Sequence, residues 1–119
     1  MREGSQELRW SGWTQTHEVR IWVGQEDGAV TLHFRVGESA PQLARLDGAE
    51  ELRVMGTGAG DGGGRFSGEY ALQLDGRELV TLAFDSEYDE DSSRLPQRLE
   101  ALLKPACIAA QCRWGGLHW

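Results

Sequence analysis

The chain has 119 residues, the usual size of one domain and long enough to bury one hydrophobic core. A composition of 39% hydrophobic and 26% charged residues excludes an intrinsically disordered chain. The net charge of −7 repels phosphate backbones and anionic lipid, so it argues against nucleic-acid and membrane partners and favours a basic protein partner. We therefore expect a single domain over residues 1–119.

Two features bear on the cellular compartment. The start of the chain is polar, and no apolar stretch is long enough to span a membrane. Two cysteines, Cys107 and Cys112, are too few for a disulfide scaffold and are expected to be buried free thiols. Both observations predict a cytoplasmic protein.

The first third of the chain alternates apolar and polar residues, the pattern of half-buried β-strands. Residues 7–13 are expected to form one strand. Residues 17–23 and 30–36 alternate in the same way around a polar, glycine-containing segment, so they are expected to pair as an antiparallel hairpin.

The two strands of this hairpin can be registered from their side chains. A one-residue slip sends every side chain to the other face, so only some loop lengths keep the two apolar sets together. A four-residue loop over residues 25–28 meets this condition and pairs Ile21 with Leu32. It also sets Glu18 opposite Arg35, an attractive pair of charges.

The middle of the chain contains a helix signal and a glycine run. Residues 39–47 carry a serine cap candidate, an early proline and apolar residues three apart, which predict a short helix. Residues 51–55 alternate as a strand. The run 56–64 contains the G-x-G-x-x-G spacing of dinucleotide sites, but the segment 65–74 that follows has the period of a strand rather than a helix. We interpret the run as a flexible hairpin connection.

A second hairpin is indicated by the Asp-Gly pair at residues 75–76. A two-residue turn would split the flanking aromatics between the two faces of the sheet. A three-residue loop over 74–76, with a bulge at Gly76, pairs Phe66 with Phe84 and keeps them on one face.

The main helix is expected over residues 93–104. Ser92 or Ser93 would cap it, a proline lies in the first turn, and Pro105 would stop or kink it. One apolar stripe runs along it: Leu95, Leu99, Leu102 and Leu103. Residues 106–114 fit either a short helix or a last strand.

These elements together predict an α+β fold. A mainly antiparallel sheet of about six strands would carry one main helix over 93–104 and one short helix over 39–47. The strand order and the oligomeric state are not determined by these patterns.

The most distinctive polar segment is the run over residues 85–91, with five carboxylates in seven residues. Its alternating acids resemble a calcium loop, but an EF-hand needs glycine where Glu90 stands and glutamate where Pro96 stands. The run is thus either a solvated loop or a patch that captures a basic protein surface. The candidate partner-binding residues in it are Asp85, Glu87, Tyr88, Asp89, Glu90 and Asp91.

Aromatic residues beside arginine form a second candidate. Trp13 and Trp22 fall on the face opposite the main apolar set, near Arg20. Tryptophan and arginine are enriched in protein-binding hot spots. The alternative is that another element of the chain packs over this face.

Motifs for catalysis and metal binding do not occur. There is no G-x-S-x-G, H-E-x-x-H or C-x-x-C, and the histidines have no recognisable nucleophile or carboxylate partner. Cys107, Cys112 and His118 are one ligand short of a structural zinc site. We therefore predict no cofactor and no metal, and an enzyme is the less favoured class.

A small, acidic protein with few motifs and a dense carboxylate loop has the properties of a stoichiometric protein-binding inhibitor. The class we predict is a bacterial immunity protein, which would neutralise a cognate cytosolic toxin or effector domain by covering its basic surface. One alternative is a small-molecule-binding or enzymatic α+β domain with an aromatic pocket. Another is a dimeric chaperone or complex subunit that associates through a sheet edge.

Overall fold

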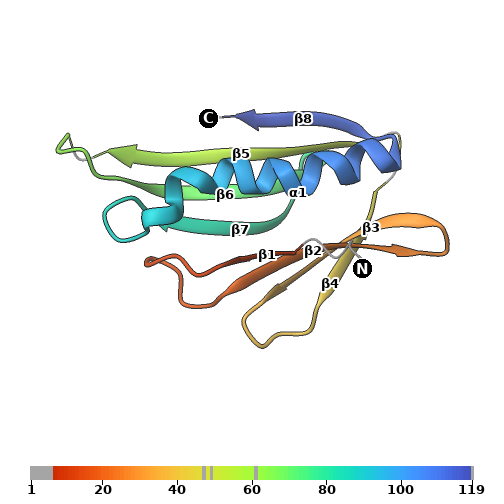
Figure 1. Ribbon diagram of the computed structural model, residues 1–119, viewed down its shortest axis with the longest axis horizontal. Helices are drawn as coiled ribbons and strands as arrows, with labels where there is room; N and C mark the ends of the chain where they lie inside the picture. Colours follow the sequence, from red (N-terminus) through yellow and green to blue (C-terminus); the bar gives the residue numbers. More distant parts are fainter. Residues whose placement is uncertain (1–6, 47, 49, 61, 119) are drawn as a thin grey trace.

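The computed structural model, which describes residues 7–46, 48, 50–60 and 62–118, has an α+β fold (Figure 1). Its strands form two four-stranded sheets, sheet A from the first third of the chain and sheet B from the remainder. The predicted fold class is confirmed. The prediction of one sheet of about six strands is wrong, because the strands divide between two sheets.

Sheet A is an antiparallel meander in chain order. Its strands are β1 (Glu7–Trp10), β2 (Val19–Glu26), β3 (Ala29–Val36) and β4 (Gln42–Arg45). The predicted alternation holds, since Val19, Ile21, Leu32 and Phe34 are all buried on the inner face. The first strand ends at Trp10 rather than residue 13, and the chain then forms a loop to β2.

The β2–β3 turn is tighter than predicted. Glu26 pairs with Ala29, so the loop consists only of Asp27 and Gly28, both with positive φ (54° and 79°). These are the dihedrals of the two-residue turn that matches strand twist. The predicted four-residue loop is therefore two residues too long, and Ile21 lies opposite Phe34 rather than Leu32.

The predicted helix over 39–47 is wrong, because the chain there forms strand β4. Ala44 and Leu46 are buried while Leu43 and Arg45 are exposed, which is a period of two. Pairing with β3 satisfies the backbone groups on the β3 side of this edge strand, and tertiary pairing outweighs a weak helix signal of so few residues.

Sheet B has the strand order β7-β6-β5-β8. It contains β5 (Glu51–Gly60), β6 (Phe66–Leu74), β7 (Arg77–Asp85) and β8 (Arg113–His118), with β8 parallel to β5 and the other pairs antiparallel. Half of the glycine run is therefore strand. Gly58 lies opposite Gly68, where an added Cβ would come within 1.9 Å of the Thr57 carbonyl oxygen, so only glycine fits this approach.

The second hairpin also differs from its predicted register. Asp75 and Gly76, with φ of 53° and 83°, form a two-residue turn. The extra residue is Leu79, which is left unpaired between Glu78 and Val80, so the bulge lies in the strand and not at Gly76. The apolar residues of both strands still lie on the predicted faces. A bulge shifts the in–out alternation of side chains by one residue wherever it occurs in the strand.

The main helix begins after a 3-10 turn. That turn, η1, spans Glu90–Arg94 and is followed by α1 (Leu95–Ala110), so the predicted serine caps are wrong and Arg94 holds the N-cap position. The helix continues through Pro105, whose missing N–H costs about 3 kcal/mol. Burial of the apolar side chains on both sides of Pro105 outweighs this cost. The buried helix residues are Leu95, Leu99, Leu102, Leu103, Ala106 and Cys107.

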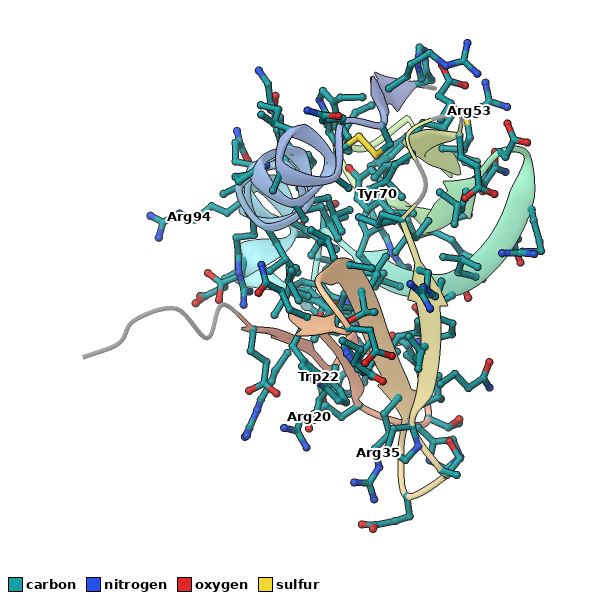
Figure 2. All side chains as sticks on the ribbon, turned by 90° about the vertical axis from the view of Figure 1, so that its right-hand side faces the viewer. Arg20, Trp22, Arg35, Arg53, Tyr70 and Arg94 are labelled. Atoms are coloured by element: carbon teal, nitrogen blue, oxygen red, sulfur yellow. A yellow bond between two sulfur atoms is a disulfide. The ribbon has the colours of Figure 1, made fainter. Side chains whose placement is uncertain are left out.

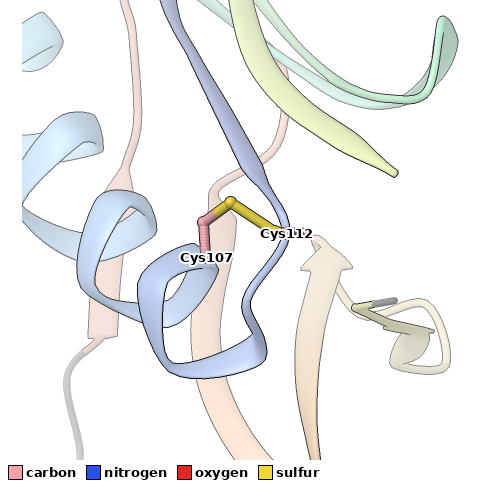
Figure 3. The surroundings of a disulfide bond; sticks show 2 residues. All are labelled: Cys107 and Cys112. Atoms are coloured by element: carbon pink, nitrogen blue, oxygen red, sulfur yellow. A yellow bond between two sulfur atoms is a disulfide. The ribbon is translucent and has the colours of Figure 1, made fainter. Parts of the chain in front are cut away.

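A disulfide joins the end of α1 to the start of β8. Cys107 and Cys112 are bonded, with their Cα atoms 5.1 Å apart (Figure 3). Gln111 between them adopts a left-handed conformation with φ of 60° and ends the helix. The expectation of two free thiols is wrong, and the argument for a reducing compartment that rested on it is lost.

The two sheets share one contiguous core with α1, which lies along their inner faces (Figure 1). Side chains also join the sheets at the outer edge of β7. The indole nitrogen of Trp10 donates to the Ala83 carbonyl at 2.6 Å, and the Gln15 amide bonds the Thr81 carbonyl and the Ala83 amide at 3.2 and 3.3 Å. In the described part of the chain, no helix is long and apolar enough to cross a membrane.

Candidate functional site

The acidic run over 85–91 folds as a tight turn between β7 and η1. The amides of Tyr88 and Asp89 both donate to the carbonyl of Asp85, at 3.1 and 2.7 Å. These bonds give the turn a defined backbone conformation, which fixes the positions from which its side chains extend.

Asp85 points inward and does not contribute to the surface. Its side chain is fully buried and accepts hydrogen bonds from the Arg65 guanidinium at 2.6 Å and from the Glu87 amide at 3.0 Å. The Arg65 hydrogen bond, supported by the Glu87 amide, outweighs burial and holds the pKa of Asp85 below its usual range. Asp85 is therefore a charged structural group.

Asp89 also has a structural role, because it fastens the β1–β2 loop to the acidic turn. Its carboxylate accepts from the Trp13 amide at 3.0 and 3.1 Å and from the Asp85 amide at 2.8 Å. A charged acceptor that bonds two backbone amides is a strong anchor. Residues 76 positions apart in the chain are thereby held together.

Above this anchor lies an exposed aromatic pair. Trp13 and Tyr88 stack with ring centroids 4.5 Å apart and an interplanar angle of 19°. Their exposed fractions are 67% and 48%. Arg65 lies over the Tyr88 ring, 5.6 Å from its centroid, so cation and ring fix each other's position.

Three carboxylates of the run remain at the surface around this pair: Glu87, Glu90 and Asp91. Glu87 is half exposed and lies 3.3 Å from Arg65. Beside the carboxylates is an open groove of about 550 Å³ that is also lined by Arg9 and Arg98. We call the surface formed by Trp13, Glu87, Tyr88, Glu90 and Asp91 the acidic-aromatic patch.

Arg20 and Trp22 lie apart from this patch, on the outer face of sheet A (Figure 2). Trp22 stacks on His33 with centroids 5.4 Å apart, and the Arg20 guanidinium lies 5.3 Å from the Trp22 ring centroid. The structure therefore divides the predicted site residues into two surfaces. No other element of the described chain buries this stack, since Arg20 and Trp22 are both partly exposed.

Residue-level prediction missed Arg65, Arg9 and Arg98. Arg65 follows the glycine run, twenty positions before Asp85, and no local signal links the two. Arg98 lies on α1 and donates to the Arg9 carbonyl at 3.4 Å. Among the described residues, no group of three or more histidine, cysteine or acidic side chains is placed to hold a metal ion.

Two grooves on the described surface differ in chemistry. The one beside the acidic-aromatic patch is mainly polar. The other, about 370 Å³, lies between the β2–β3 hairpin and α1 and is lined mainly by aliphatic residues, among them Val23, Val30 and Leu102. Two aromatic residues, Trp10 and Tyr88, are among those that line the polar groove.

Comparison with protein-family models, with curated proteins and with solved structures found no match to this chain.

Proposed function

We propose that the protein is a stoichiometric protein-binding inhibitor that docks on a basic partner through the acidic-aromatic patch. The observation that carries this proposal is the exposed Trp13–Tyr88 stack, which is held in place by the Asp89 carboxylate. Large aromatic side chains are rarely left exposed as a fixed pair, and rigid aromatics are the side chains from which binding hot spots are built.

The charges around the pair support a basic partner. Glu87, Glu90 and Asp91 border the aromatics, and the net charge of −7 adds a long-range field of the same sign. Such a field speeds encounter with a positively charged surface, while the desolvated aromatic centre slows dissociation. Fast association with a basic surface and slow dissociation are what a bacterial immunity protein needs in order to cover the basic active-site surface of its toxin.

Protein binding is favoured over catalysis by the state of the one buried carboxylate in the turn. Asp85 is committed to Arg65, and its lowered pKa keeps it ionised at neutral pH. A general acid at that pH needs the opposite shift. The carboxylates of the acidic-aromatic patch itself are exposed to water.

The test compares wild type with two triple variants that remove the same charge. The patch variant neutralises the surface carboxylates and the control neutralises exposed carboxylates elsewhere: Glu87→Gln, Glu90→Gln and Asp91→Asn against Glu38→Gln, Glu69→Gln and Glu78→Gln. Each tagged protein is used to capture partners from its native lysate at low and high salt. We expect one dominant basic protein, retained by wild type and control and weakened by salt.

With that partner purified, association and dissociation rates separate the two parts of the patch. The triple patch variant is expected to lower the association rate about tenfold or more at low salt. Trp13→Ala is expected to raise the dissociation rate, by about thirtyfold for a hot spot of 2 kcal/mol. Equal rates for wild type, patch variant and control would contradict the proposal.

A further inference from the structure

The outer face of sheet A carries a second surface, which we call the arginine face after its row of arginines. In the observed register, Arg9 on β1 lies opposite Arg20 on β2, and Arg20 lies opposite Arg35 on β3. Figure 2 shows Arg20 and Arg35 together with Trp22 on this side of the sheet, away from α1. The other charged and apolar residues on the same face are Glu7, Glu26, His33, Leu43 and Arg45, with a Glu26 carboxylate oxygen 3.9 Å from the His33 ring.

Three arginines in direct cross-strand register disfavour the folded state, since like charges opposite each other repel. Glu7 is the shared counter-charge, and it bonds Arg20 at 2.9 Å and Arg9 at 3.1 Å. The Arg20 hydrogen bond in particular holds the pKa of Glu7 below its usual range. Two cations thus share one carboxylate within the sheet.

Arg35 has the weakest internal compensation of the three. Its bonded carboxylate is Glu38, 3.3 Å away, whose side chain is fully solvated, so this pair contributes little. The Nε atom of Arg35 is buried and lacks a hydrogen-bond partner within the described chain. A desolvated, unsatisfied donor costs about 1–3 kcal/mol. The side chain as a whole is 29% exposed, so an incoming acceptor can reach the part of the guanidinium that lies outside the buried Nε.

The rest of the arginine face is arranged to hold these cations in place. Arg20 lies over the ring of Trp22, which stacks in turn on His33, and the His33 ring nitrogen is 2.8 Å from the Thr31 hydroxyl. Leu43, 48% exposed, lies opposite His33 on the edge strand and adds an apolar contact. A fixed row of guanidinium groups loses little side-chain entropy on binding.

We propose that the arginine face binds an extended, acidic segment of a protein. Adjacent strands are about 4.8 Å apart, so the three arginines span roughly 10 Å, and an extended chain presents side chains of one face about 6.7 Å apart. Two carboxylates two positions apart therefore reach neighbouring arginines. Each can accept paired hydrogen bonds from a guanidinium. This surface does not depend on the acidic-aromatic patch.

A nucleic acid fits this face less well. Base recognition on an open sheet needs an aromatic ring with a free face, whereas Trp22 is already stacked with His33 and Arg20. The net charge of −7 also opposes a polyanion, while a short carboxylate segment feels mainly the local arginines.

The experiment titrates the full chain at low ionic strength with a short peptide of alternating glutamate and serine, and separately with oligothymidine of equal length. Side-chain nitrogen resonances of arginine and tryptophan are followed by NMR. We expect the peptide to shift the Arg20, Arg35 and Trp22 signals. Arg20→Gln and Arg35→Gln should each weaken peptide binding about tenfold, the loss of one charge-assisted hydrogen bond.

The matched controls are Arg77→Gln and Arg113→Gln, exposed arginines outside the face, which should leave the affinity unchanged. Thermal unfolding separates docking from a structural role, because Arg35→Gln should keep or raise Tm. Tighter binding of the oligonucleotide, peptide shifts elsewhere, equal loss in the controls, or a marked fall in Tm for Arg35→Gln would each overturn the proposal.

Discussion

Single carboxylates in the acidic run have different roles. Asp85 and Asp89 bond backbone amides and a guanidinium, while Glu90 and Asp91 face water and Glu87 is half exposed beside Arg65. The sequence shows only the density of charge, because the partners of Asp85 and Asp89 come from Arg65 and from the amide of Trp13, far away in the chain. Which acids remain available could not be predicted from spacing.

Asp85 makes stability depend on acid pH. Its folded-state pKa is lowered by Arg65, so its stabilising contribution is present above the unfolded aspartate pKa of about 3.9 and is lost as pH falls through the lower, folded value. We expect Tm to drop as pH decreases below about 4. Asp85→Asn should lower Tm at pH 7 and flatten this acid dependence, whereas Glu78→Gln should retain the wild-type profile. Calorimetry between pH 2 and 7 measures both.

Asp89 is expected to control the order of the aromatic pair. Asp89→Ala leaves the Trp13 and Asp85 amides without their acceptor and should cost about 1–3 kcal/mol of unfolding free energy. The near-ultraviolet circular dichroism of the Trp13–Tyr88 stack should weaken in parallel. Asp91→Ala, at an exposed position, should change stability by less than about 0.5 kcal/mol. Equal losses in the two variants would refute this role of Asp89.

Among the elements, the hairpins show which features can be predicted from the alternation of apolar and polar side chains. It predicted the correct faces of β2 and β3 and of β6 and β7, but it could not fix the turn length, since any shift by two residues preserves the faces. The Asp-Gly pairs at 27–28 and 75–76 carry the missing information, because both form two-residue turns with positive φ. At the first turn, the Asp-Gly pair at 27–28 predicts the two-residue turn better than side-chain alternation does.

The first of these turns offers a test of the register. Gly28 has φ of 79°, where a β-branched residue is strained, so Gly28→Val should destabilise the protein by about 1–2 kcal/mol. Asp27→Asn should be neutral, since asparagine also suits the first position of this turn. Urea unfolding of both variants gives the comparison. A neutral Gly28→Val would indicate a longer loop.

The segment of β4 was predicted as a helix, and the main helix, correctly predicted, was expected to end at residue 104 rather than at Ala110; the two errors share a reason. Both were interpreted from local signals, a proline early in 39–47 and Pro105 late in the main helix. In the structure, pairing with β3 makes the first segment a strand, and burial of Ala106 and Cys107 carries the helix past Pro105. Contacts distant in sequence decided both elements, and the local pattern of a single sequence gives no access to them.

For the whole molecule, the two sheets meet where the end of β1 and the loop that follows it approach β7. Gly12 lies so close to β7 that an added Cβ would be 2.0 Å from the Ala83 carbonyl oxygen. Gly12→Ala should force the sheets apart locally and cost about 1–3 kcal/mol, with loss of the Trp10 to Ala83 hydrogen bond. Ser11→Ala, at the exposed neighbour, should have little effect. Denaturation and the Trp10 indole NMR signal report the two consequences.

The amide of Gln15 has a further consequence for behaviour in concentrated solution. By bonding both the Thr81 carbonyl and the Ala83 amide, it imitates one peptide group of a ninth strand along β7. Positions that a neighbouring molecule would need for strand-to-strand growth are thereby already occupied. We therefore expect a single glutamine side chain to hinder strand addition at this part of the β7 edge, with far less chain than an additional strand would require.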